Sequence, residues 1–275
     1  MKNLLLIADM DIKESFRSKW FLLYILVFIG LVGTLFISGV TDSRVAGFTG
    51  LTRLLLLFIQ ICFVILPIFI LITTVRSISY DRELNTLEYL LSYPISLNEY
   101  YFGKVLGRAF IVIFPIFITL LFMVIISAFK SKAIPFNIIF LYSILLSVMS
   151  FVFLSFGFFI SSVVKSQEMA LAAAFFVWLF LLAFLDLALI GIMMKSSVNE
   201  YVIYSVALLN PIEIFRIASI SLFDPNLAVI GPAAYYILDI FGNTLFLVYS
   251  IIYPIILSFI MLILGYLIFI KRDLV

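Results

Sequence analysis

The sequence lacks histidine and has a single cysteine, Cys62, among its 275 residues. One cysteine cannot form an internal disulfide, and the absence of histidine excludes a Ser-His-Asp triad and the common zinc sites. Cys62 lies in an apolar stretch, where a cysteine usually packs as a small inert side chain. No G-x-x-x-x-G-K-[ST] loop occurs, so the chain has no ATP-binding site of the usual kind. We therefore predict no catalytic site, no metal and no cofactor in this chain.

Charged side chains are also scarce, at 12% of the residues, whereas hydrophobic side chains make up 65%. A soluble domain has about half apolar and about a quarter charged residues. A core that buried so much apolar surface in water is implausible at this length. The net charge of +2 gives no reason to expect a nucleic-acid partner. The composition predicts an all-α polytopic membrane protein, with residues 1–275 forming a single transmembrane domain in contact with lipid.

Apolar stretches recur along the chain with the length of about 20 residues that a membrane-spanning helix needs. The six predicted spans are 20–40, 54–75, 109–129, 136–164, 169–194 and 244–270. None of them shows the alternation that is typical of a transmembrane β-barrel.

Residues 1–19 alternate apolar and charged side chains at helical spacing, which predicts an amphipathic helix on the membrane surface. A cytosolic extension of the first span fits this segment equally well. Most of the 17 basic residues fall in segments that an inside N-terminus would place in the cytoplasm. Basic residues concentrate on the cytoplasmic side of membrane proteins, so we predict that both termini lie inside.

The predicted inner connection, residues 76–107, is long for a loop, and such loops are usually functional. Its first part reads as one short helix, with Asp81 as the N-cap, Glu83 in the first turn and Pro94 at the end. Ser96 and Glu99 have the spacing of a capping box that opens the next helix. The expected helix carries an apolar stripe of Tyr80, Leu84, Leu87 and Leu91. The stripe fits a partner's groove or the protein's own helix ends about equally well.

The predicted outer connection, residues 195–243, contains a strong helix start. Asn210 suits the cap, Pro211 the first helical position and Glu213 the third, with Arg216 one turn further on. The helix is too short to cross a bilayer and too apolar to lie in water. We expect it to be re-entrant, packed against protein in the outer leaflet.

Asp186 lies deep in the fifth predicted span, where an ionised carboxylate costs about 2.5–3.5 kcal/mol and must face protein or water. It either lines a substrate path or has a structural partner on a neighbouring helix, and both interpretations stay open. Gln60 in the second span is a weaker candidate of the same kind.

The pattern as a whole resembles the permeases of ABC-2 type transporters. Asp81-Arg82-Glu83 and Thr86-Leu87-Glu88 are typical of the helix that docks on the ATPase in that superfamily. Two further pieces, Leu208-Leu209-Asn210-Pro211-x-x-Ile214-x-Arg216 and Asp186-Leu187, resemble the permeases of Nos-type transporters, which serve copper–sulfur cluster maturation in nitrous oxide reductase.

The resemblance implies a permease subunit in a bacterial cytoplasmic membrane, working as a homodimer and moving a sulfur species. Its partners would be a NosF-like ABC ATPase, which binds ATP and Mg, and a NosD-like periplasmic protein. The residues implied in ATPase coupling are Asp81, Arg82, Glu83, Leu84, Leu87, Glu88 and Leu91. An ABC-2 exporter of a lipid, drug or peptide is the alternative, and an ATP-independent channel, carrier or scaffold is a more distant one.

Overall fold

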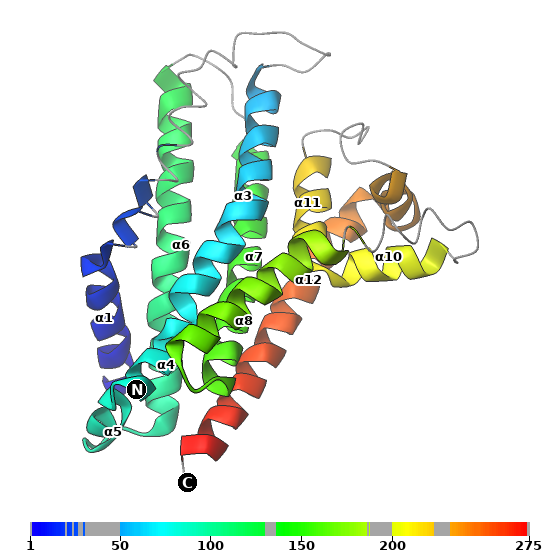
Figure 1. The fold of residues 1–275 in the computed structure, drawn as a ribbon. Coiled ribbons are helices and arrows are strands. Elements are labelled where there is room, and N and C mark those ends of the chain that lie inside the picture. Colours follow the sequence, from blue (N-terminus) through cyan, green and yellow to red (C-terminus); the bar gives the residue numbers. More distant parts are fainter. Residues whose placement is uncertain are drawn as a thin grey trace.

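The computed structural model describes residues 2–19, 21–23, 25–26, 30, 50–129, 136–185, 187, 200–222 and 232–273. This part of the chain folds into helices and connecting turns (Figure 1). Five helical stretches are long and apolar enough to cross a membrane: Ile59–Glu83, Leu97–Thr119, Phe140–Val163, Gln167–Phe184 and Ile237–Lys271. They correspond to the second to sixth predicted spans, so the chain is polytopic. The first predicted span, 20–40, lies mostly outside the described residues.

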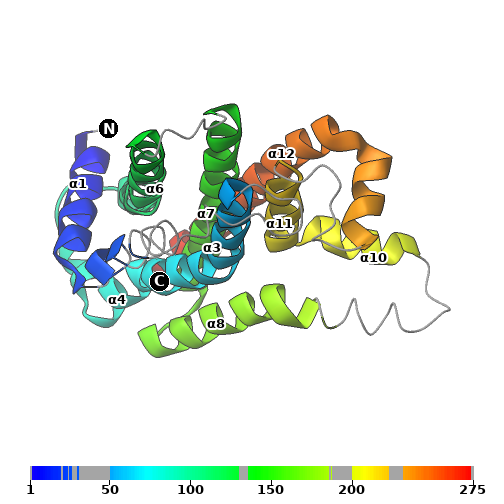
Figure 2. The ribbon, with the colours of Figure 1, turned by 90° about the horizontal axis from the view of Figure 1, so that it is seen from above.

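Helix α7 (Phe136–Val163) forms the centre of the bundle. It packs against α3 (Gly50–Thr74), α6 (Leu97–Phe129) and α12 (Pro232–Asp273), as Figure 2 shows from above. About 67% of its most apolar stretch is buried inside the protein. A helix that is apolar on every side is expected in such a position, because it has no polar face to turn outward.

Helix α1 (Lys2–Arg17) lies along α6, and two glycines of α6 allow the close approach. A Cβ atom at Gly103 would come within 2.9 Å of the Ile7 side chain and of the Leu4 carbonyl oxygen. At Gly107 it would come within 3.0 Å of the Ala8 carbonyl oxygen. Glycines four residues apart form a groove for a neighbouring helix, as small residues do in other membrane proteins.

Apolar side chains of α1 are exposed as well as packed, among them Leu5, Leu6 and Met10. The charged side chains of Lys13 and Arg17 are exposed as well. This amphipathic helix matches the periodicity of the sequence, and its placement on a membrane surface stays a prediction.

The fifth predicted span begins with α8 (Gln167–Leu179), which continues into a π-helical turn, η1 (Phe180–Phe184). Ser166 caps α8 by accepting a hydrogen bond from the Met169 N–H at 3.3 Å. Only 11% of this span is buried inside the protein. Phe175, Phe176, Phe180 and Phe184 are exposed along it. Figure 2 shows α8 at one side of the bundle.

Helix α12 breaks at Gly242, whose backbone angles are φ 70 and ψ 154. Glycine adopts this conformation at low cost because it has no Cβ. The break divides a short first part from the long last span, and the bend is visible in Figure 2. The predicted start of the sixth span, residue 244, follows directly after it.

Two shorter helices, α10 (Glu200–Leu209) and α11 (Pro211–Ser221), lie between the fifth and sixth predicted spans. Helix α11 packs against α3, α7 and α12. At the opposite end of the bundle, Figure 1 places the labelled N- and C-termini near α4 (Arg76–Glu83) and α5 (Thr86–Leu91).

Candidate functional site

The segment that the resemblance assigns to ATPase coupling consists of two helices, α4 and α5. The prediction of one helix up to Pro94 is therefore wrong. Asn85 separates the two helices because its backbone is left-handed, with φ 55, a conformation that asparagine tolerates better than most residues. The prediction that Asp81 is an N-cap is also wrong, since Asp81 lies inside α4 and is buried.

The break also divides the predicted apolar stripe. Leu87 is buried at 4% exposure, whereas Leu84 is 55% exposed and Tyr80 is exposed too. The side chain of Leu91 lies outside the described part of the structure. The stripe assumed one continuous helix, and the turn at Asn85 rotates α5 relative to α4. Leu87 packs into the protein's own core, while Leu84 points outward.

An exposed ridge begins at the turn after α4 and continues along and just past α5; it is formed by Leu84, Asn85, Glu88, Tyr89 and Tyr93. Tyr89, at 63% exposure, stacks edge-on against Tyr93. Their hydroxyl oxygens are 3.0 Å apart, and this hydrogen bond raises the pKa of Tyr93. The ridge combines one carboxylate with apolar and aromatic side chains, a composition that suits a protein partner.

Three side chains join α4 to the end of α7 and to the turn that leads into α8. The Ser161 hydroxyl accepts hydrogen bonds from the Ile78 and Ser79 N–H groups, at 3.1 and 2.9 Å. These N–H groups belong to the first half of α4, so the Ser161 hydroxyl ties the start of this helix to the end of α7.

In the other two bonds the side chain belongs to α4 and the backbone atom belongs to the turn or to the start of α8. Arg82 donates to the Val164 carbonyl oxygen at 3.2 Å. The Glu83 carboxylate accepts from the Gln167 N–H at 3.0 Å, at the start of α8. A carboxylate is favoured at that end of a helix by the helix dipole. Arg82 thus contacts the turn after α7, and Glu83 contacts the first residue of α8, so that α4 and α8 are joined.

A buried ion cluster, formed by Asp11, Asp81, Lys104 and Arg108, links α1, α4 and α6. Lys104 lies 2.7 Å from the Asp81 carboxylate and 3.6 Å from that of Asp11. Arg108 lies 3.1 Å from Asp11. The Tyr100 hydroxyl also donates a hydrogen bond to Asp81 at 2.6 Å. The two positive charges neutralise the two carboxylates, and buried charges are tolerated only when they are paired in this way.

The start of α6 contacts α1 as well. Ser96 and Glu99 form a reciprocal cap, in which the Glu99 N–H reaches the Ser96 hydroxyl at 3.3 Å and the Ser96 N–H reaches the Glu99 carboxylate at 3.2 Å. Asn3 of α1 donates to the Pro94 carbonyl oxygen at 3.1 Å. Helix α1 therefore contacts the chain just after α5 through Asn3, and α6 through Asp11.

In the predicted outer connection, Asn210 caps α11 by accepting a hydrogen bond from the Ile212 N–H at 3.1 Å. Pro211 occupies the first helical position, and Glu213 lies 2.5 Å from Arg216 one turn later. The Asn210 amide also donates to the Leu181 carbonyl oxygen, at 2.8 Å, which joins α11 to η1. The position of α11 in the outer leaflet stays a prediction.

The structure describes one of the two substrate-path candidates, Gln60. Gln60 is exposed on α3. Asp186 lies outside the described residues, so its place on a path stays a prediction. Within the described residues, no group of three His, Cys, Asp or Glu side chains could hold a metal ion.

Sequence reasoning missed Asp11 and Ser161 as members of the site. A carboxylate in the middle of an amphipathic helix was the available signal for Asp11, because it falls on the same side as Ile7 and Ala8. For Ser161, one of several serines in α7, the sequence offers no comparable signal.

The profile of the family described as ABC-2 family transporter protein matches residues 5–274. The chain is 24% identical to the probable ABC transporter permease protein NosY of Stutzerimonas stutzeri over 231 residues, covering 82% of this chain and 84% of the relative. It is 25% identical to the protein of the same name from Pseudomonas aeruginosa over 227 residues, covering 79% and 82%.

Proposed function

Since the chain belongs to the ABC-2 family of transporter proteins, whose members are membrane subunits without an ATPase domain, we propose that it is the permease of a Nos-type transporter. Membership makes it a multi-pass transport protein, and an ABC permease works with an ATPase subunit. No cofactor is expected in a membrane subunit of this family. The proposed cargo is a sulfur species for the copper–sulfur cluster of nitrous oxide reductase.

The likeness to two NosY proteins over about four fifths of each chain carries this proposal. The composition agrees with this choice of cargo, because a chain with no histidine and one buried cysteine offers no imidazole ligand and a single buried thiol to a copper ion. The proposed partners are a NosF-like ATPase, a NosD-like periplasmic protein and a second copy of the chain.

We further propose that the exposed ridge of α4 and α5 receives the ATPase. In that arrangement both termini and the coupling segment lie in the cytoplasm. Movement of the ATPase would reach α8 through the bonds of Arg82 and Glu83 to the α7–α8 turn. The fifth predicted span would then move relative to the central helix α7 and open the path.

The test is a deletion of this gene in a host that makes nitrous oxide reductase. The reductase should be secreted but lack its copper–sulfur cluster, as read from its absorption spectrum and copper content. Purification of the tagged chain from native membranes should recover an ATPase and a periplasmic protein. A normal cluster in the deletion strain would contradict the Nos role, and recovery of an ATPase alone would favour an exporter of a lipid, drug or peptide.

A further inference from the structure

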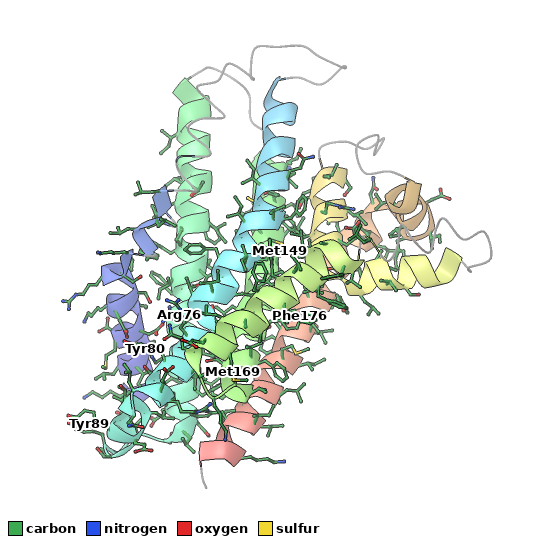
Figure 3. All side chains as sticks on the ribbon, viewed as in Figure 1. Arg76, Tyr80, Tyr89, Met149, Met169 and Phe176 are labelled. Atoms are coloured by element: carbon green, nitrogen blue, oxygen red, sulfur yellow. The ribbon has the colours of Figure 1, made fainter. Side chains whose placement is uncertain are left out.

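A polar cavity of about 270 Å³ lies between α1, α3, α4, α6 and α8, beside the buried ion cluster. Its lining includes three cations, Arg76, Lys104 and Arg108. Figure 3 shows Arg76 and Tyr80 close together on the side of the bundle between α1 and α8. Ligand pockets for drug-sized molecules have volumes of about 300–1,000 Å³, so this cavity has room for a headgroup but not for a whole lipid.

The cavity lies where the helices change from charged to apolar sequence. Arg76 directly follows the apolar run of α3. Arg108 is the last charged residue of α6, and Gln167 and Glu168 are the last polar residues before the apolar run of α8. Three helices change from charged to apolar sequence around this cavity. Such a change indicates the boundary of the bilayer, where lipid headgroups lie.

Hydroxyl groups complete the lining, from Ser18, Thr73, Ser77 and Tyr80. Ser77 is 2% exposed, and its hydroxyl has no hydrogen-bond partner within the described part of the chain. A buried polar group without a partner is costly and uncommon in native structures. Guanidinium and hydroxyl donors together are the usual ligands of a phosphate group.

A second, narrow cavity of about 20 Å³ adjoins the first and shares Ser18, Thr73 and Arg108 with it. The rest of its lining is mainly apolar: Phe21, Phe69, Ile70, Ile111 and Val112. The polar cavity therefore continues into an apolar slot between α3 and α6. This slot has room for about one water molecule, so the acyl chains of a lipid whose headgroup lies in the polar cavity would run outside the slot, along the apolar surface of the spans.

The charges of the cavity are balanced. Asp81 and Glu14 lie in the lining, and Asp11 pairs with Arg108 behind it, so three carboxylates match the three cations. A balanced cavity favours a zwitterionic headgroup over one with several negative charges. Glu14 is exposed and can accept hydrogen bonds from a primary ammonium group, which a quaternary ammonium cannot donate.

We propose that this cavity binds the headgroup of one phosphatidylethanolamine molecule, with the phosphate at Arg76 and Arg108 and the ammonium at Glu14. The bound lipid lies against α1, α4 and α8 together, so it stabilises the arrangement of the coupling segment. The proposal does not depend on the cargo or on the identity of the ATPase.

Native mass spectrometry of the full chain, released from bacterial membranes in mild detergent, tests the proposal. One phosphatidylethanolamine should remain bound per chain. Arg76→Ala should reduce the retained lipid about tenfold, because a charge-assisted phosphate contact is lost. Arg17→Ala is the matched control, since it removes an exposed arginine of α1 outside the cavity and should retain the lipid. Equal retention by the two variants, or no bound phospholipid in the wild type, would overturn the proposal.

Two more arms identify the ligand. In nanodiscs of mixed lipids, Glu14→Gln should lower the preference for phosphatidylethanolamine over phosphatidylcholine several-fold, and an unchanged preference would overturn the ammonium contact. Displacement of the lipid by millimolar inorganic phosphate would show a site for free anions and would overturn the lipid assignment. If Arg76→Ala does not fold, Ser77→Ala removes a single buried hydroxyl and should still reduce retention several-fold.

Discussion

Lys104 lies between two carboxylates that come from different helices. Asp81 belongs to α4 and Asp11 to α1, so the ammonium group of Lys104 holds three elements together. Removing one member of such a cluster leaves an uncompensated charge in a buried place, and this is far more costly than the loss of a surface pair. The cluster is therefore the part of the site most sensitive to a single substitution.

We predict that Lys104→Met destabilises the protein by about 3–5 kcal/mol, the usual cost of breaking a buried ion pair. The control is Lys13→Met, which breaks the exposed pair of Lys13 and Asp9 and should cost about 0–1 kcal/mol. Denaturant unfolding of both variants in detergent provides the measurement. Similar losses for the two would show that the cluster is not buried in the membrane-embedded protein.

On the ridge, the charge of Glu88 can be reversed without disturbing the core, because its side chain is exposed. We predict that Glu88→Arg reduces ATPase recovery and transport at least tenfold while the unfolding midpoint stays within experimental error, since a misplaced charge at an interface costs several kcal/mol. Asp239→Arg reverses another exposed carboxylate, away from the ridge, and should leave ATPase recovery intact. Transport that survives Glu88→Arg would move the docking surface elsewhere.

The roles of some single residues could be predicted from the sequence, and the roles of others could not. The cap formed by Asn210, Pro211 and Glu213 depends on neighbours within one turn, so local rules place it correctly. The role of Asp81 depends on Tyr100 and Lys104, which belong to another helix. Local rules assigned Asp81 to a cap because they contain no information about α6.

Among the elements, α1 owes its position to Gly103 and Gly107. A methyl group at Gly103 would meet the backbone of α1, which cannot move aside as a flexible side chain can. We predict that Gly103→Ala lowers stability by about 1–3 kcal/mol, the usual cost of overpacking, and makes α1 more sensitive to protease. Gly30→Ala is the matched control, because a Cβ there meets nothing within 4 Å. Unchanged proteolysis of α1 in Gly103→Ala would contradict the close packing.

The positions of the long apolar helices were predictable from the sequence, whereas the break in the coupling segment was not. Each of the five long apolar helices overlaps one of the second to sixth predicted spans, because length and hydropathy act along the chain, but their ends differ: the third predicted span starts at residue 109, whereas the helix starts at Leu97. The division of the coupling segment at Asn85 was not predicted, since a left-handed residue is only one of several conformations open to asparagine. The bonds that hold α4 before this residue come from Ser161, Val164 and Gln167, which are distant in the sequence.

At the scale of the whole molecule, burial is uneven. The central span α7 is 67% buried, and the span that begins with α8 is 11% buried within one chain. Lipid can cover the exposed surface of this span, and a second copy of the chain in the proposed homodimer could bury it instead. In that proposed dimer we expect the exposed surface of α8 to lie beside its copy.

We predict that Phe176→Cys, at a position 62% exposed on α8, forms a disulfide-linked dimer in oxidised membranes. The natural Cys62 is buried and should not react. Ile260→Cys on α12 is a control of comparable exposure and should stay monomeric. Dimers are read on a non-reducing gel, and equal cross-linking at the two positions would indicate random collision in place of a defined interface.

The joint between α4 and the α7–α8 turn has a consequence for how the protein can vary. Each of its bonds runs from a side chain on one element to a backbone atom on the other: Ser161 to the N–H groups of α4, Arg82 to the Val164 carbonyl and Glu83 to the Gln167 N–H. Any residue except proline supplies that N–H, so position 167 can change freely while Glu83 cannot. Among homologues the joint should appear as an acidic residue that is kept without a co-varying partner.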